Sequence, residues 1–175
     1  EIKAGRDIKN DDVIEVRGST LKYVSRGGLK LEKAMELGAT GVINGMKEDV
    51  VAKVMELTNG RGADLVIETA GTQITTVQAI HMARKGSNIV LVGYSKTGEM
   101  TLPMSLVLDK ELTFKTVFRY RHIYPLAIDA VANGKVNLKG IVTDIFSLDD
   151  CQNAMDFSMN NKADIVKAVI KISQD

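Results

Sequence analysis

The spacing of apolar and polar residues changes once along the 175-residue chain. Residues 12–25 hold two short alternating runs, VIEV and LKYV, joined by the turn-forming residues RGST. This pattern predicts an N-terminal β-hairpin or two successive edge strands. From Leu29 onward the apolar residues follow helical spacing, and Gly38 stands where that helix would end. We therefore expect a front segment of residues 1–28 and a main domain of residues 29–175.

Short apolar strands alternate with helical segments through the main domain. The expected strands cover residues 41–44, 63–71, 87–94 and 111–120. The expected helices cover the stretches EDVVAKVMELTNG, TTVQAIHMARKG and YPLAIDAVANGK. Near-continuous apolar strands separated by helices are typical of a parallel sheet with helices on both faces. The sequence thus predicts an α/β, Rossmann-like fold.

Three of the expected strands end in residues that suit a ligand. The carboxyl ends of parallel strands meet at one edge of a sheet, where ligands bind. Small residues at two of these ends would let a flat cofactor approach the backbone, and Arg119 at the third could donate to a carboxamide or phosphate. For any one strand end taken alone, a purely structural interpretation fits as well as a cofactor site. In that interpretation the glycines only end the strands and Arg119 is a solvated cation.

Composition narrows the classes of protein. A net charge of +1 gives no general attraction for RNA or an anionic membrane, so only a local basic patch would bind either. Cys151 is the single cysteine, which excludes an internal disulfide and a Cys-rich metal cluster. No apolar run approaches the roughly 20 residues that cross a bilayer, and the charged opening does not resemble a signal peptide. We therefore expect a cytoplasmic protein without a membrane segment.

From about Leu31 to Ile172 the chain resembles the later part of the cofactor domain of zinc-dependent medium-chain dehydrogenases, closest to the sorbitol and xylitol dehydrogenase branch. The resemblance rests on the stretches ELGATGVIN, ELTNGRGADLVIETAGT, QAIHMARKGSNIVLVGY, KELTFKTVFRYRHIYPLAI and GKVNLKGIVTDIFSLDD. It implies a six-stranded domain that binds NAD or NADP, in which Phe118 and Arg119 lie near the nicotinamide. The residues implied to line the cofactor cleft are Ala70, Gly71, Val92, Gly93, Phe118 and Arg119.

Parts of that family's pattern have no counterpart here. No stretch resembles the catalytic domain with its zinc ligands and proton relay. A first strand followed by a G-x-G-x-x-G turn is also missing, which would weaken or abolish nucleotide binding. His81, His122 and Cys151 are far apart and lack the spacing of metal ligands. We expect no bound zinc and no catalytic residue in this chain.

The front of the chain resembles a different family. Residues 2–31, through DDVIEVRG and KYVSRGGLKLEKA, are similar to the end of the RNA-binding domain and the start of the methyltransferase domain of hemolysin A-type ribosomal RNA methyltransferases. The resemblance implies a catalytic role for Lys30, whereas an exposed helical lysine is the simpler interpretation. The segment LKLEKAM fits both families, which indicates a fusion of the two.

The same front segment also predicts which nucleotide, NAD or NADP, would bind more tightly. Aligned on ELGAT, the dehydrogenase pattern ends its second strand at residues 23–25 and has its ribose-binding Asp where this chain has Ser25. An acid there repels a 2′-phosphate, whereas Ser25 and Arg26 would accept one. LKYVS would then replace the lost strand, and NADP would be preferred over NAD. An exposed turn at residues 25–28 is the alternative.

Two functions remain open on the sequence. The first is the cofactor-domain fragment of an NAD(P)-dependent polyol or alcohol dehydrogenase, inactive alone, which forms a homodimer through the sheet edge near MTLPMSLVLDKELTF. The second is a non-catalytic fusion or RNA-interacting protein that keeps the fold and has lost the site. Whether the chain is itself an enzyme stays open, and polyol oxidation with added zinc and NAD would distinguish the two functions.

Overall fold

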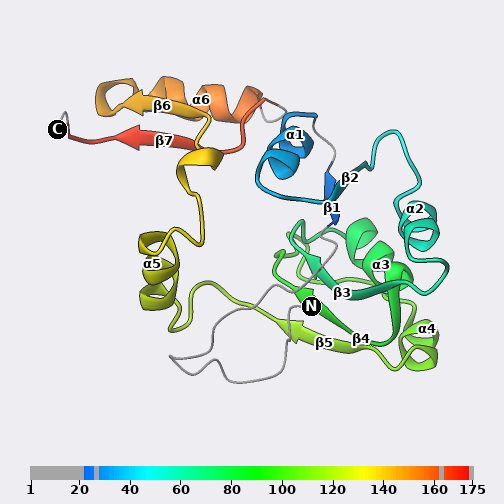
Figure 1. Cartoon of the computed structure of the whole chain (residues 1–175). Helices are drawn as coiled ribbons and strands as arrows, with labels where there is room; N and C mark the ends of the chain where they lie inside the picture. The colour runs from blue at the N-terminus through cyan, green and yellow to red at the C-terminus, as the bar shows by residue number, and fades with distance from the viewer. Residues whose placement is uncertain (1–21, 26–27, 162–163, 174–175) are drawn as a thin grey trace. The chain divides into compact units, whose positions relative to one another are not determined.

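A computed structural model describes residues 22–25, 28–161 and 164–173 (Figure 1). Asp49–Arg121 form one compact unit. Residues 22–48 and 122–173 belong to a second unit. In the described part of the chain no helix is long and apolar enough to cross a membrane.

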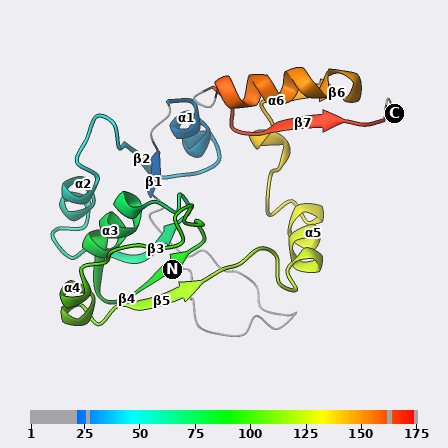
Figure 2. The same ribbon diagram turned by 180° about the vertical axis from the view of Figure 1, so that it is seen from behind.

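The Asp49–Arg121 unit contains a three-stranded parallel sheet in the order β3–β4–β5. Its strands are β3 (Ala63–Glu68), β4 (Ala83–Leu91) and β5 (Thr113–Thr116). Its helices are α2 (Val50–Leu57), α3 (Gln73–Met82) and α4 (Met104–Asp109). β4 lies between β3 and β5 in both views (Figure 1 and Figure 2), with Ile89 paired to Val66 on one side and to Phe114 on the other.

Local sequence sets where the helices of this unit begin and end. The side chains of Asp49 and Thr72 cap α2 and α3 by accepting from the amides of Ala52 and Thr75. After α2 the backbone turns left-handed at Asn59 and Gly60, whose φ values are 53° and 77°. Each cap satisfies groups that the helix leaves free, so these boundaries follow from single residues.

The core of this unit lies between the sheet and its helices. Ile80 on α3 and Ile89 on β4 are both fully buried, and burying such a side chain stabilises the fold by roughly 1.5–3 kcal/mol. The remaining members of the buried cluster are Ala79, Ala83 and Val107. The core therefore packs the sheet against its helices.

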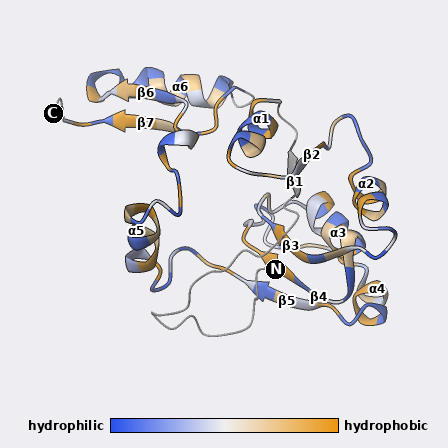
Figure 3. Cartoon of the chain, viewed as in Figure 1, coloured by the Kyte–Doolittle hydropathy of each residue, from blue (hydrophilic) through white to orange (hydrophobic). Residues whose placement is uncertain are grey.

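The second unit contains two parallel strand pairs. β1 (Lys22–Ser25) pairs with β2 (Gly41–Asn44), and α1 (Gly28–Glu36) connects them. β6 (Asp144–Ser147) pairs with β7 (Ala168–Lys171), which is apolar along most of its length (Figure 3). The other elements are α5 (Tyr124–Ala132), η1 (Lys139–Ile141), η2 (Leu148–Asp150) and α6 (Cys151–Asn160).

The predicted α/β fold with parallel strands is confirmed, because every strand pair among the described residues is parallel. The structure shows no β-hairpin among the described residues, and because VIEV lies outside them the expected N-terminal hairpin stays a prediction. Lys22–Ser25 form β1, which pairs in parallel with β2 across α1. Such a crossover places two strands side by side in the same direction.

Several predicted elements extended too far, including the strands expected over residues 63–71 and 87–94, which end at Glu68 and Leu91. Two further cases have a clear cause. The helix expected through residue 86 ends at Met82, and β4 begins at once with Ala83, which pairs with Ala63 of β3. The strand expected over residues 111–120 is limited to Thr113–Thr116. Tertiary pairing with neighbouring strands, rather than local propensity, sets both limits.

Candidate functional site

The carboxyl ends of β3, β4 and β5 are joined by hydrogen bonds. The amides of Val92 and Gly93 donate to the carbonyl oxygen of Glu68 over 2.8 and 3.0 Å. The amide of Val117 donates to the carbonyl oxygen of Leu91 over 3.0 Å. The chain segments that follow the three strands therefore leave the sheet at the same edge.

Two glycine turns pack against each other at this edge. Gly71 has a φ of 66°, and a Cβ atom added to it would lie 2.5 Å from the carbonyl oxygen of Tyr94. A Cβ atom on Gly93 would overlap the backbone of Gly71 in the same way. The glycines thus allow one turn to approach the other. The sequence suggested that glycine is needed here so that a cofactor can approach the backbone. The structure gives another reason, because the two turns pack against each other.

Aromatic rings and a cation flank the two turns. The ring of Phe118 lies 6.4 Å from that of Tyr94, and the guanidinium carbon of Arg119 lies 5.2 Å from the Phe118 ring centre. Tyr94 is 78% exposed and Phe118 is 68% exposed. Exposed rings beside an arginine can stack on a planar ligand and bind its anionic or amide groups.

We call this edge the strand-end surface. It is formed by Ala70, Gly71, Val92, Gly93, Phe118 and Arg119, which are the six residues predicted from these strand ends. Ser25 ends β1, opposite Asn44 of β2, in the other unit. Arg26 lies outside the described residues. The role of Ser25 and Arg26 in binding the 2′-phosphate of NADP therefore remains a prediction.

Sequence reasoning missed Glu68, which is 5% exposed. Its carboxylate accepts hydrogen bonds from the turn that follows β3. The signal available in the sequence was an acidic residue that closes the apolar run ADLVIE and precedes three small residues. A buried carboxylate requires donors, and the amides of the following turn can supply them.

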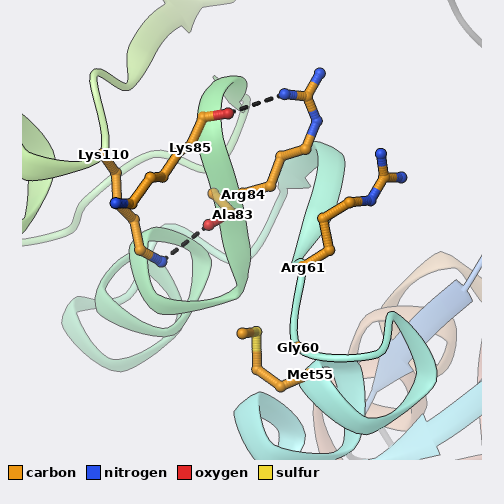
Figure 4. A pocket seen from close by; sticks show the side chains of 7 residues that line it. All are labelled: Met55, Gly60, Arg61, Ala83, Arg84, Lys85 and Lys110. Carbon is orange, nitrogen blue, oxygen red and sulfur yellow. Dashed lines mark hydrogen bonds between the residues drawn. The ribbon is translucent and has the colours of Figure 1, made fainter.

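A hollow of about 390 Å³ lies at the opposite, amino-terminal ends of these strands (Figure 4). Lys110 donates there to the carbonyl oxygens of Ile80, His81 and Ala83 over 2.8–3.0 Å. Burial lowers the pKa of Lys110. All three ammonium protons therefore bond to the backbone around the end of α3.

The arginines of this hollow are also engaged by the protein. Arg84 Nε and Arg61 Nη2 lie 2.5 and 2.8 Å from the carboxylate of Asp64. The hydrogen bond from Arg84, together with the charges of Arg61 and Arg84, lowers the pKa of Asp64 against the opposing effect of burial. Because Lys110 bonds to the backbone and Arg61 and Arg84 bond to Asp64, three of the four cations that line the hollow are engaged by the protein, which makes the hollow a poor candidate for the cofactor site.

Metal-binding side chains do not gather in the part of the chain that the structure describes. No group of three His, Cys, Asp or Glu residues there has the geometry to hold a metal ion. Cys151 is a free thiol in α6. Within the described ranges, the strand-end surface is therefore the candidate site, and its residues suit an organic ligand.

A parallel sheet with glycine turns and exposed rings at its carboxyl edge has the architecture of a dinucleotide-binding, Rossmann-like domain. Residues 15–133 match the family described as zinc-binding dehydrogenase, and the chain belongs to that family. The match begins inside the segment that resembles methyltransferases, and no comparison supports a methyltransferase front. The predicted resemblance to dehydrogenases is confirmed.

The similar proteins described here are dehydrogenases or dehydrogenase-like proteins about twice as long as this chain. An uncharacterized zinc-type alcohol dehydrogenase-like protein of Escherichia coli is 44% identical over 82% of this chain and 41% of its own length. Sorbitol dehydrogenase of Bacillus subtilis is 34% identical over 81% of this chain and 40% of its own length. The chain therefore spans about two fifths of the curated relatives that it matches.

Solved structures agree with this assignment. An Escherichia coli oxidoreductase/dehydrogenase of unknown specificity superimposes with a TM-score of 0.83 at 41% identity, covering 90% of this chain and 45% of its own. A putative zinc-binding dehydrogenase of Sinorhizobium meliloti, bound to NADP, has a TM-score of 0.78 at 28% identity, covering 87% of this chain and 45% of its own. The dinucleotide-binding part of the family is thus the part represented here.

Proposed function

We propose that this chain is the cofactor-binding part of an NAD(P)-dependent polyol or alcohol dehydrogenase and that its strand-end surface binds the nicotinamide nucleotide. The observation that carries the proposal is the convergence of the two glycine turns with Phe118 and Arg119 at one edge of the sheet. A polyol is the substrate class because sorbitol dehydrogenase is among the relatives.

Each part of the surface has a role in this proposal. The backbone of the two turns presents a flat face to the nucleotide, and the exposed ring of Phe118 packs against a planar group. Arg119 donates hydrogen bonds to a carboxamide or phosphate oxygen. The bound nucleotide supplies the hydride chemistry, and we assign this chain the binding and orientation of the nucleotide without a catalytic step.

We further propose that NADP is preferred over NAD. β1 lies beside β2 in parallel register and ends at Ser25, which supports the idea that LKYVS takes the place of the second strand of the cofactor domain. An uncharged Ser25 followed by Arg26 would accept a 2′-phosphate where a carboxylate would repel it. The assembly that fits best is a homodimer paired through the edge beside β5, which has a single neighbour among the described strands.

Calorimetric titration of the purified chain with NADH and NADPH tests the function. We expect saturable binding of both, with NADPH tighter. The absence of saturable binding of either nucleotide would refute the proposal, and tighter binding of NADH would refute the preference alone. From this chain by itself we expect no polyol oxidation when zinc and NAD are added, and turnover that a chelator abolishes would contradict that expectation.

A further inference from the structure

Glu68 is a carboxylate buried beneath the strand-end surface. It accepts hydrogen bonds from the amide of Ala70 over 2.9 Å and from the amide of Gly71 over 3.0 and 3.1 Å. The hydroxyl of Thr75 donates to the same carboxylate over 2.7 Å. Among the described residues no cation forms a salt bridge with it. Amides and a hydroxyl therefore replace the water that a buried carboxylate would lose.

This arrangement also ties the two glycine turns together. The backbone carbonyl of Glu68 accepts from the amides of Val92 and Gly93, while its side chain holds the turn of Ala70 and Gly71. A Cβ atom on Gly93 would lie 2.7 Å from a carboxylate oxygen of Glu68. One residue thus fixes both turns, and its side chain fits only because position 93 has no Cβ.

The direction of these hydrogen bonds determines what the surface can bind. Phosphate-binding turns point their free amides at the ligand. Here the amides of Ala70 and Gly71 bond to a carboxylate inside the protein, so an anion outside cannot use them. The fixed negative charge of that carboxylate also repels a phosphate placed above it.

We propose that Glu68 is a positioning and specificity-determining residue that makes this part of the surface accept the nicotinamide ring rather than the phosphates of the dinucleotide. The inference rests on the proposed function, since it concerns which half of the nucleotide lies over the turn of Ala70 and Gly71. Glu68 acts through that backbone and does not touch the ligand.

The test compares the full chain with Glu68→Gln, Thr75→Val and the control Glu56→Gln. Glu68→Gln replaces one carboxylate oxygen by an NH2 group, which places donors against the amide of Gly71. Thr75→Val removes a single donor to the carboxylate. Glu56 lies on α2 in an exposed pair with Lys53, so its neutralisation controls for lost charge alone. Thr75→Val preserves the test if Glu68→Gln fails to fold.

Two measurements decide the outcome. The first is amide hydrogen exchange at Ala70 and Gly71 without ligand, which we expect to accelerate in Glu68→Gln and, less strongly, in Thr75→Val. The second is NADH titration followed by the nicotinamide emission. We expect affinity to fall about tenfold in Glu68→Gln and about threefold in Thr75→Val, with the emission of the bound ring shifted toward that of free NADH.

The alternatives are distinguishable. Glu68→Gln binding within about twofold of the parent, or weaker binding with an unchanged emission of the bound ring, would overturn the inference. A change of the same size in Glu56→Gln would overturn it as well. The absence of saturable binding of both NADH and NADPH by the parent would refute the proposed function and the ring preference together. In that case, faster amide exchange in Glu68→Gln would still support the role of Glu68 in holding the turn.

Discussion

Gly71 and Gly93 touch through their backbones, because a Cβ atom placed on Gly93 would lie 2.0 Å from the amide nitrogen of Gly71. This contact joins the turns that follow β3 and β4 and sets the shape of the strand-end surface. It also means that the glycine at position 93 is required by the protein itself, before any ligand binds. The two turns should therefore respond as one unit to substitution.

Gly93→Ala should lower the free energy of unfolding by about 3 kcal/mol, since backbone atoms of Gly71 would have to move to admit the methyl group. Gly98→Ala is the control, because position 98 has open space around it and a φ of 76°. It should cost only about 1 kcal/mol of left-handed backbone strain. Urea denaturation of both variants measures the difference, and equal costs would contradict the close contact.

Lys110→Met should destabilise the Asp49–Arg121 unit by about 1–3 kcal/mol. The substitution keeps most of the apolar stem and leaves the carbonyl oxygens of Ile80, His81 and Ala83 without their shared donor. Lys96→Met, in the exposed segment after β4, is the matched control and should change stability by less than about 0.5 kcal/mol. Thermal unfolding checks this, and a similar shift for both variants would exclude the proposed anchoring of α3.

Asp64→Asn should remove a small stabilisation that depends on pH. The hydrogen bond from Arg84 and the nearby charges lower the pKa of Asp64 in the folded state, so the unfolded chain binds the proton more readily. The stabilisation is therefore fully present above pH 3.8 and is lost as pH falls through the folded-state pKa.

The size of this effect is limited by solvent, because the Asp64 side chain is 54% exposed. We expect less than about 1 kcal/mol at neutral pH, and less again in 1 M salt, where exposed charges are screened. Unfolding of parent and Asp64→Asn from pH 2 to pH 7 measures it. A difference between them that grows toward low pH would reverse the predicted sign.

Arg119→Gly should weaken nucleotide binding without lowering the stability of the fold. Arg119 has a left-handed φ of 54°, a conformation that glycine adopts without strain. The free energy of unfolding should stay equal or rise by up to about 1 kcal/mol. NADPH affinity should fall about tenfold, because the guanidinium beside Phe118 is lost. Thermal unfolding and calorimetry on one preparation check both signs, and unchanged affinity would remove Arg119 from the site.

Much of the site could be predicted because strand ends are visible in an apolar pattern. ADLVIE and the later run ending in VLVG each stop at small residues, and parallel strands bring those stops to one edge. The role of Glu68 could not be predicted in the same way. Its donors are amides of a turn that forms only when β3 and β4 pair, so the sequence showed an acid without showing its burial.

The front of the chain shows the same limit. The run LKYV predicted a strand, and Lys22–Ser25 form one, but the run carried no information about the strand's partner or direction. Pairing with GVIN across α1 makes that strand parallel to β2, which the local sequence could not show. Likewise α3 ends at Met82, earlier than helical propensity suggested, where Ala83 pairs with β3 and Lys110 bonds the last carbonyls.

The sequence by itself determined the α/β alternation, the capping of α2 and α3, and the residues at the strand ends. These features depend on side-chain periodicity and on hydrogen bonds between near neighbours in the chain. The tertiary structure alone decided the partner of β1, the end of α3, the burial of Glu68 and the contact between Gly71 and Gly93. Each of these depends on backbone groups brought together from separate elements, whose positions are fixed only when the strands pair and the core closes.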